Sequence, residues 1–219
     1  MGIEIDLLRN YPRASRDLEG RELSKSSETR RIARQFGREY FDGDRAFGYG
    51  GLHYQPRFWE PVIPDIVSHF ELTNSSRVLD VGCAKGFFLY DLSRALPGAT
   101  LRGVDISDYA ISNAMPEVRD RIQRASATTL PFEDGSFDLV VSINTVHNLD
   151  RNDCLKALSE IERVSSHGSF VTVDAFRNDA ERVRMEQWNL TALTVMSTDD
   201  WKIFFAKAGY TGDYYWFIP

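Results

Sequence analysis

The stretch Ser76–Leu92, SRVLDVGCAKGFFLYDL, constrains the fold more than any other part of the chain. Within it Val78, Leu79 and Val81 are apolar and strand-forming, and the run stops at Gly82. Gly82 and Gly86 bracket a turn, and apolar residues at helical spacing follow from Phe87. A buried strand, a glycine turn and a helix start in this order predict the opening unit of a nucleotide-binding α/β fold.

The spacing of the glycines narrows the choice of nucleotide. Dinucleotide and phosphate sites use G-x-G-x-x-G or G-x-x-x-x-G-K-[ST], and neither pattern occurs here. The chain instead has D-x-G-x-x-x-G, formed by Asp80, Gly82 and Gly86. This pattern resembles the first motif of the class I S-adenosylmethionine-dependent methyltransferases. The resemblance implies a Rossmann-like fold and S-adenosyl-L-methionine as the cofactor.

Three further stretches lie at the spacing that this family requires. Leu101–Asp105, LRGVD, is a predicted second strand, and its final acid can accept hydrogen bonds from ribose hydroxyls. Ala125–Phe132, ASATTLPF, resembles the stretch that lines the adenine, although many relatives have Asp where this chain has Ser126. Ser136–Asn144, SFDLVVSIN, resembles the fourth strand, whose end lies near the methyl-transfer centre. The resemblance covers residues 77–168.

The resemblance also implies which residues hold the cofactor, with Asp105 as the strongest single contact. Cys83 is expected to be a small turn residue rather than a nucleophile. The expected cofactor-binding residues are Asp80, Gly82, Cys83, Ala84, Gly86, Asp105, Ile106, Ser126, Ala127, Thr128, Ser142 and Asn144.

Length and composition predict a single α/β domain. The chain has 219 residues, of which 42% are hydrophobic and 26% charged, and no apolar run is long enough to span a membrane. We expect residues 1–70 to form N-terminal helices and a lid loop within the same domain as the cofactor-binding part, residues 71–219. The net charge of −6 disfavours nucleic acid as a partner. The first residues do not resemble a secretory signal, so a cytoplasmic protein is expected.

Alternating strands and helices predict a doubly wound, mostly parallel sheet. Relatives commonly end in an antiparallel hairpin, so either 190–196 is the partner of the last strand or the sheet has six strands. The expected strands are 77–81, 101–105, 121–125, 136–144, 168–175 and 210–217, with 190–196 as the alternative seventh, and the expected helices are 27–40, 58–70, 87–96, 107–115, 152–164, 179–188 and 198–208.

The segment Phe41–Arg57, FDGDRAFGYGGLHYQPR, combines glycines and aromatic residues without a regular period. A loop of this kind is either a packed Ω-loop or an active-site lid, and we favour the lid. Tyr49 and His53 are its candidate catalytic residues. The preceding arginines alternate with acids on a predicted helix, which is typical of a solvated face more than of a phosphate-binding patch.

His147 follows the predicted fourth strand, where ligands of such sheets bind, and is a candidate general base. The alternative is that His147 only caps a short helix or packs against Leu149. The expected function is methyl transfer to a hydroxyl or amine of a small molecule, such as a sugar or secondary metabolite. A non-catalytic cofactor-binding or partner-binding protein and a nucleotide-dependent oxidoreductase are the alternatives. The spacing of potential ligand residues implies no metal. The sequence leaves the oligomeric state open, with a homodimer as one alternative.

Overall fold

A seven-stranded sheet forms the centre of the molecule in the computed structural model, which describes residues 2–13 and 18–219. The strand order is β3-β2-β1-β4-β5-β6, β7 pairs with β5 beside β6, and every pair is parallel. The strands are β1 (Arg77–Val81), β2 (Thr100–Asp105), β3 (Ile122–Arg124), β4 (Phe137–Ile143), β5 (Ser165–Phe176), β6 (Met196–Ser197) and β7 (Asp213–Phe217).

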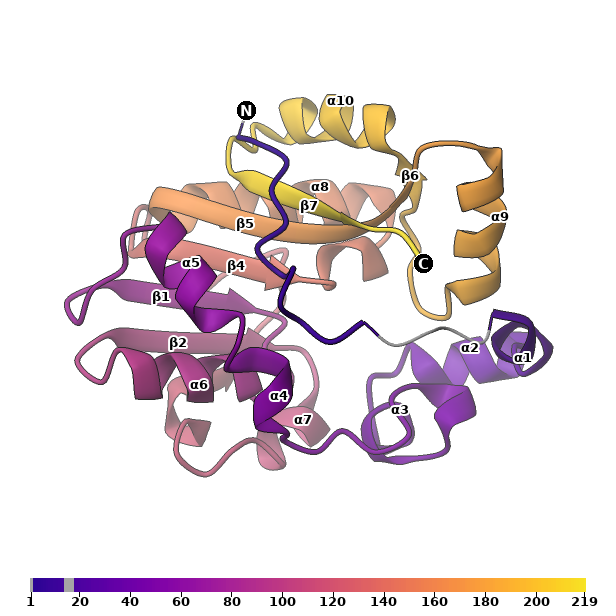
Figure 1. Ribbon diagram of the computed structural model, residues 1–219, viewed down its shortest axis with the longest axis horizontal. Coiled ribbons are helices and arrows are strands. Elements are labelled where there is room, and N and C mark those ends of the chain that lie inside the picture. The colour runs from indigo at the N-terminus through magenta and orange to yellow at the C-terminus, as the bar shows by residue number, and fades with distance from the viewer. Residues whose placement is uncertain (1, 14–17) are drawn as a thin grey trace.

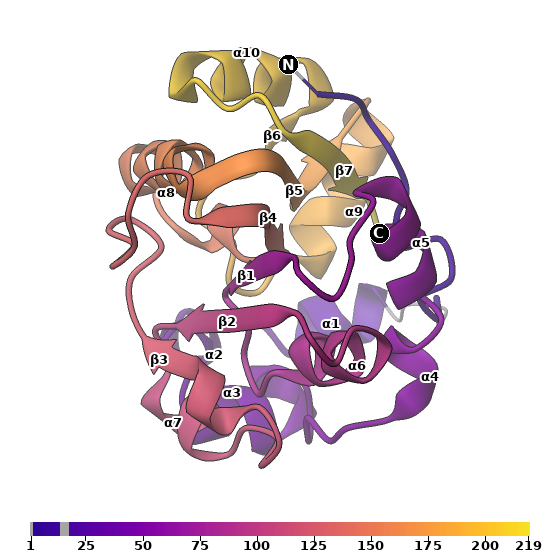
Figure 2. The same cartoon turned by 90° about the vertical axis from the view of Figure 1, so that its left-hand side faces the viewer.

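Helices cover both faces of this sheet (Figures 1 and 2). One apolar core joins the sheet to α8 and α10, and a second joins its other face to α5, α6 and the N-terminal segment. The described helices are α1 (Leu18–Leu23), α2 (Ser27–Ala33), α3 (Arg38–Asp42), α4 (Pro56–Trp59), α5 (Ile63–His69), α6 (Phe87–Ala95), α7 (Asp108–Ser112), α8 (Arg151–Val164), α9 (Asp179–Trp188) and α10 (Thr198–Ala208), with short 3₁₀ turns η1 (Arg45–Phe47), η2 (Arg119–Arg121) and η3 (Val146–Asn148).

The predicted doubly wound α/β fold with an N-terminal helical segment is confirmed. Strands were predicted at each of β1 to β5, and α9 and α10 have the predicted bounds. Alternating side chains explain why β1 is buried: Leu79 belongs to the core under α8 and α10, whereas Val78 belongs to the core under α5 and α6. The helices α1, α2 and α3 lie beside the carboxyl ends of the strands, and α1 packs against α9 (Figure 1).

Two predicted helices are interrupted. The expected helix 27–40 divides into α2 and α3, because Phe36 adopts a positive φ of 48° and Gly37 then begins the next helix as its N-cap. Ser26, not Ser27, is the N-cap of α2. The expected helix 58–70 divides into α4 and α5, each with a proline in its first turn.

The C-terminal part differs most from expectation. Residues 190–195 are irregular, and only Met196–Ser197 pairs with the end of β5, so the predicted strand 190–196 is wrong. The last strand, β7, runs parallel to β5 with Phe170 opposite Asp213 and Asp174 opposite Phe217. The antiparallel hairpin is therefore absent from the part of the chain described, and β7 ends at the same edge of the sheet as β1 and β4.

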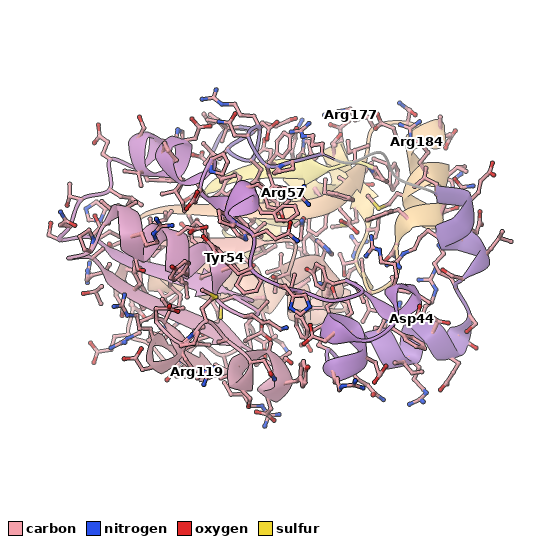
Figure 3. All side chains as sticks on the ribbon, turned by 60° about the horizontal axis from the view of Figure 1, so that its bottom comes forward. Asp44, Tyr54, Arg57, Arg119, Arg177 and Arg184 are labelled. Atoms are coloured by element: carbon pink, nitrogen blue, oxygen red, sulfur yellow. The ribbon has the colours of Figure 1, made fainter. Side chains whose placement is uncertain are left out.

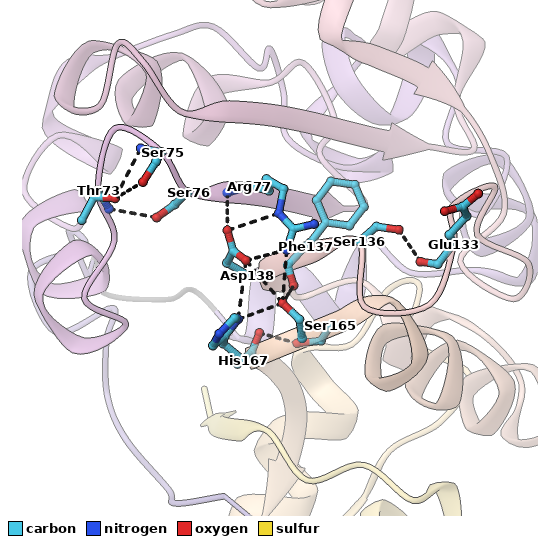
Figure 4. A network of polar contacts seen from close by, with 12 residues as sticks. Thr73, Ser75, Ser76, Arg77, Glu133, Ser136, Phe137, Asp138, Ser165 and His167 are labelled. Atoms are coloured by element: carbon cyan, nitrogen blue, oxygen red, sulfur yellow. Dashed lines mark hydrogen bonds and ion pairs between the residues drawn. The ribbon is translucent and has the colours of Figure 1, made fainter.

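A polar network fixes the opposite edge, at the amino ends of β1, β4 and β5 (Figure 4). The Asp138 carboxylate accepts hydrogen bonds from the Arg77 backbone N–H at 2.8 Å and from its guanidinium at 2.7 Å. The Ser166 hydroxyl donates to the Phe137 carbonyl at 2.9 Å and contacts the His167 ring. These contacts hold the register of the three central strands away from the functional edge.

Candidate functional site

The glycine turn after β1 is built for close approach of backbone. Gly82 has φ of 83°, and a Cβ at this position would lie 2.2 Å from the Thr145 hydroxyl oxygen. Only glycine satisfies both the backbone angle and the available space. The backbone N–H groups of Gly82 and Cys83 donate to the Val104 carbonyl at 2.8 and 3.1 Å, which ties the turn to the end of β2.

Asp105, at the end of β2, holds this turn in place. One carboxylate oxygen accepts the Ala84 N–H at 2.7 Å, and the other accepts the Ser107 N–H at 2.8 Å. Burial raises the pKa of Asp105, and the backbone N–H groups oppose that shift. The carboxylate is 9% exposed as a residue and faces the cavity described next.

A cavity of about 300 Å³, the first cavity, opens at the carboxyl ends of β1, β2 and β4. This is the edge where open α/β sheets bind ligands. Eight residues predicted from the sequence line it together: Tyr49, Gly82, Ala84, Asp105, Ile106, Ser126, Ala127 and Asn144. The Ser126 hydroxyl contacts the Thr128 hydroxyl at 2.7 Å and accepts the Thr128 N–H at 3.2 Å, so Thr128 supports Ser126 without lining the cavity.

Four other predicted residues lie behind the lining. Gly86 is the N-cap of α6 with φ of 76°, and the Ser142 hydroxyl donates to the Val81 carbonyl at 3.0 Å. Cys83 is buried, and burial raises the pKa of its thiol well above the usual value. Asp80 is also buried, and burial together with the nearby Asp105 charge raises its pKa to about 8. These four residues therefore support the turn without lining the cavity.

The N-terminal segment covers the first cavity with aromatic side chains. Phe36, Tyr40, Phe41 and Tyr49 line it, with Tyr40 and Phe41 ring centroids 5.1 Å apart in an edge-to-face contact. The predicted lid contains Phe41 and Tyr49, Tyr40 directly precedes it, and Arg34 and Phe36 were not predicted to line a cavity. The one local signal near Phe36 is the following Gly37, a residue that weakens a helix.

An ion pair fastens this covering segment to the glycine turn. The buried Lys85 ammonium contacts both Asp42 carboxylate oxygens, at 2.7 and 2.8 Å, and donates to the Leu52 carbonyl at 2.8 Å. The Tyr109 hydroxyl of α7 donates to the same carboxylate at 2.7 Å. Sequence reasoning missed Lys85 and Asp42, although a lysine inside an otherwise apolar glycine turn is an unusual choice.

The rest of the covering segment returns along the outside of the sheet. Figure 3 shows Asp44 among the N-terminal helices, and Tyr54 and Arg57 where the chain passes α6. The Tyr54 hydroxyl donates to the buried Asp91 carboxylate at 2.5 Å. His53, a predicted catalytic residue, is exposed and lines neither this cavity nor the second one.

A second cavity of about 180 Å³ adjoins the first, and four residues line both: Tyr40, Tyr49, Asn144 and Asn148. His147 lines the second cavity from η3. Its Nδ1 accepts the Asp174 backbone N–H at 3.2 Å, and its Nε2 lies 3.6 Å from the Asp174 carboxylate. Burial lowers the pKa of His147, against the opposing effect of Asp174. The ring is therefore neutral near pH 7, with its proton on Nε2.

Within residues 2–13 and 18–219, no group of three His, Cys, Asp or Glu side chains is placed to hold a metal ion. The same residues include no helix that is long and apolar enough to cross a membrane.

Comparisons with known proteins converge on one family. Residues 79–173 match the family model described as a methyltransferase domain. The chain is 34% identical over 98 residues to a demethylmenaquinone methyltransferase of Roseiflexus sp., a match to 43% of this chain and 40% of that protein. It is 28% identical to the 27-O-demethylrifamycin SV methyltransferase of Amycolatopsis mediterranei, over 63% of this chain and 55% of that one.

The fold matches solved structures as well. The YcgJ protein of Bacillus subtilis superposes with a TM-score of 0.55 at 21% identity, covering 67% of this chain and 66% of that chain. At this level of identity the likeness concerns the fold. The matched regions span about half the length of the two curated relatives named above.

Proposed function

Because the chain belongs to the class I S-adenosylmethionine-dependent methyltransferase family, we propose that it transfers a methyl group to a hydroxyl or amine of a small molecule. The observation that carries this proposal is the arrangement of two joined cavities. The first holds the motif residues around a glycine turn, and the second begins where Asn144 and Tyr49 line both. A cofactor in the first cavity would therefore face an acceptor in the second.

The residues of the first cavity fit S-adenosylmethionine. A side chain at Gly82 would collide with Thr145, so glycine is required there, and Gly82 and Ala84 line the cavity with little side-chain bulk. We assign the ribose hydroxyls to Asp105, the adenine to Ser126 and Ala127, and the amino-acid end to the turn at Gly82 and Ala84. Asp105 has the right chemistry because a carboxylate accepts hydrogen bonds from paired hydroxyls.

Bound S-adenosylmethionine supplies an electrophilic methyl group, so the protein contributes mainly position and the exclusion of water. Alignment of two reactants lowers a barrier by up to about 7 to 11 kcal/mol. The aromatic cover made by Phe36, Tyr40, Phe41 and Tyr49 excludes water from this junction. We propose that Tyr49 and His147 contact the acceptor, because both line the second cavity.

The role of His147 depends on the acceptor. A hydroxyl needs a base, whereas a neutral amine needs only position. The Nδ1 atom of His147 already accepts a backbone N–H, so the neutral ring presents an Nε2–H donor towards Asp174. Both ring nitrogens therefore face Asp174, and this geometry supports a positioning role for His147 in the wall of the second cavity.

Kinetics of the His147→Gln variant separate the two roles. With a hydroxyl acceptor and His147 as base, the turnover number should fall by about 10² to 10⁴ with little change in cofactor affinity. If the turnover number on the true acceptor falls less than about tenfold, His147 does not act as the base.

Two measurements test the proposed function. Isothermal titration with S-adenosylhomocysteine should give saturable binding, and NAD and NADP should give none. A screen of small hydroxyl and amine acceptors with methyl-labelled S-adenosylmethionine should then identify turnover. Binding without turnover on any acceptor would favour a non-catalytic protein, and binding of NAD instead would favour an oxidoreductase.

We further propose that residues 1–70 and 71–219 act as one domain. The Lys85–Asp42 ion pair joins the two parts through buried groups, and both parts line the first cavity. His53 is a surface residue of the covering segment, and we propose no catalytic role for it.

A further inference from the structure

The second cavity has an excess of positive charge in a chain whose net charge is −6. Arg21 of α1 and Arg45 of η1 line it, and Asp174 is the one carboxylate among its described lining residues. No ion pair joins Arg21 or Arg45 to a carboxylate among the residues that the structure describes. Arg31 and Arg38 of the N-terminal helices pair with neighbouring glutamates, whereas Arg30 and Arg34 donate to backbone carbonyls.

The two guanidiniums are held in place by uncharged groups. Arg21 donates to the Arg45 carbonyl at 3.0 Å and lies over the Trp188 ring, 5.6 Å from its centroid. Arg45 itself donates to the Gly48 carbonyl. Burial and the neighbouring Arg45 lower the pKa of Arg21, so each cation disfavours the other. Two like charges are therefore kept together in the lining that also contains Asp174, and neither forms an ion pair within residues 2–13 and 18–219.

Two buried polar atoms of the same lining also lack a hydrogen-bond partner: the donor Nε of Arg21 and the acceptor Oδ1 of Asn148. Unpaired buried groups are costly, and in a cavity they are typical of positions that a ligand completes. The lining also has an apolar part, with Trp188 and Phe217 ring centroids 6.0 Å apart.

We propose that the methyl acceptor carries an anionic group, a carboxylate or a phosphate, and that Arg21 and Arg45 bind this group in the second cavity. Guanidiniums match both anions because they donate paired, charge-assisted hydrogen bonds. The apolar part of the acceptor lies against Trp188 and Phe217. The anion orients the acceptor so that its nucleophile faces the junction at Asn144 and Tyr49. This inference rests on the proposed methyl transfer and specifies its substrate class.

Binding of simple anions tests the site without requiring the true substrate. Inorganic phosphate and benzoate are titrated into the full chain, with S-adenosylhomocysteine present and ionic strength held constant with sodium chloride. We expect saturable binding of at least one anion to the wild type. The Arg21→Gln and Arg45→Gln variants should each weaken it at least tenfold, because a charge-assisted pair of hydrogen bonds is lost.

Arg102→Gln is the matched control, since Arg102 is an exposed arginine on β2 that lines neither cavity, and it should bind the anion as the wild type does. Arg21 helps to hold α1, so the exposed Arg45 provides the variant expected to keep the fold. Unchanged anion binding in a folded Arg45→Gln variant, or no saturable binding of either anion to the wild type, would overturn the inference.

The two proposals fail in distinguishable ways. If the methyltransferase proposal is wrong, S-adenosylhomocysteine will not bind to the wild type, whether or not an anion binds. Acceptors compared in matched pairs, 4-hydroxybenzoate with phenol and phosphoethanolamine with ethanolamine, extend the test to turnover. Each charged member should be the better substrate, and its advantage should shrink in Arg45→Gln. Faster turnover of the neutral members would contradict the inference and leave methyl transfer intact.

Discussion

Asp105 has a structural role and a proposed ligand role, and a single substitution affects both. Its two oxygens already accept N–H groups from the glycine turn and from the start of α7, and it also lines the first cavity. The ligand role and the structural role therefore depend on the same carboxylate. The family motif made Asp105 and Gly82 predictable, because strand end, glycine and acid follow one another at fixed spacing.

The first prediction concerns this residue. Asp105→Ala should weaken S-adenosylhomocysteine binding at least tenfold, because hydrogen bonds to a charged group contribute about 1.5 to 3 kcal/mol each. Thermal unfolding should also shift downwards, since two backbone N–H groups lose their acceptor. Titration calorimetry measures the first effect. Asp108→Ala, at an exposed acid three residues further on, is the control and should bind normally. An unchanged affinity in Asp105→Ala would refute the ribose contact.

Asp80 predicts a dependence of stability on pH. Its folded pKa of about 8 lies above the usual 3.8, so the folded protein binds a proton that the unfolded chain releases between these values. Stability should therefore be highest below about pH 4 as far as Asp80 is concerned, and its contribution should be lost as the pH rises towards 8. Asp80→Asn, which mimics the protonated acid, should show a shallower decline in urea unfolding from pH 5 to 8. Equal slopes would contradict the buried, protonated state.

Other site residues could not be predicted from local sequence. Lys85 and Asp42 are 43 positions apart and meet only because the N-terminal segment folds back over the glycine turn. The charge pattern that favours a solvated helix face covers residues 28–39, whereas Arg21 precedes it and Arg45 lies in the predicted lid. That interpretation holds for Arg31, whereas tertiary packing brings Arg21 and Arg45 to the second cavity.

At the scale of elements, the periodic segments were predictable and the interruptions were not. The helices α9 and α10 have side-chain N-caps from Asn178 and Ser197, and Gly209 ends α10 in a left-handed conformation, so both ends were readable. The break at Phe36 has no such marker in its apolar spacing. The irregular run 190–195 contains strand-forming residues, but the edge of β5 beside it is taken by β7 along Phe170–Asp174.

The attachment of the covering segment gives the third prediction. Asp42→Asn leaves the Lys85 ammonium buried without a charged partner, which should cost on the order of 3 kcal/mol of unfolding free energy. Cleavage within residues 43–55 by limited proteolysis should become faster. Tyr109→Phe is the milder comparison, because it removes one hydroxyl and should cost about 1 kcal/mol. The same cleavage rate in Asp42→Asn and wild type would show that the ion pair does not hold the segment.

At the scale of the whole molecule, the N-terminal residues protect the open edge of the sheet. The Ile5 N–H donates to the Tyr214 carbonyl at 2.9 Å, the Tyr214 N–H donates to the Ile3 carbonyl at 3.1 Å, and Leu7 is buried in the core under α5 and α6. Ile3, Ile5 and Leu7 alternate with acids, a pattern typical of a strand, but no strand was predicted here. The contact exists because β7 lies at the edge and offers unpaired backbone groups.

Removal of residues 2–8 should therefore lower the thermal midpoint and promote association. The exposed groups of β7 would pair with another chain, so light scattering should show more self-association than in the full chain at equal concentration. Leu7→Ala separates the two effects: it should lower stability by about 2 to 5 kcal/mol without promoting association. A deletion variant with the association state of the full chain would argue against edge protection.

The parallel direction of β7 also decides how the protein can be handled in experiments. The strand ends at Phe217, which lines the second cavity, and the Pro219 carbonyl accepts a hydrogen bond from Arg184 of α9. A purification tag or fluorescent fusion joined after Pro219 would lie beside the second cavity, where we propose that the acceptor binds, and would compete with the acceptor for space. Labels for kinetic work are better placed on an exposed side chain of α10, such as Ile203, because α10 covers the opposite face of the sheet from α5 and α6.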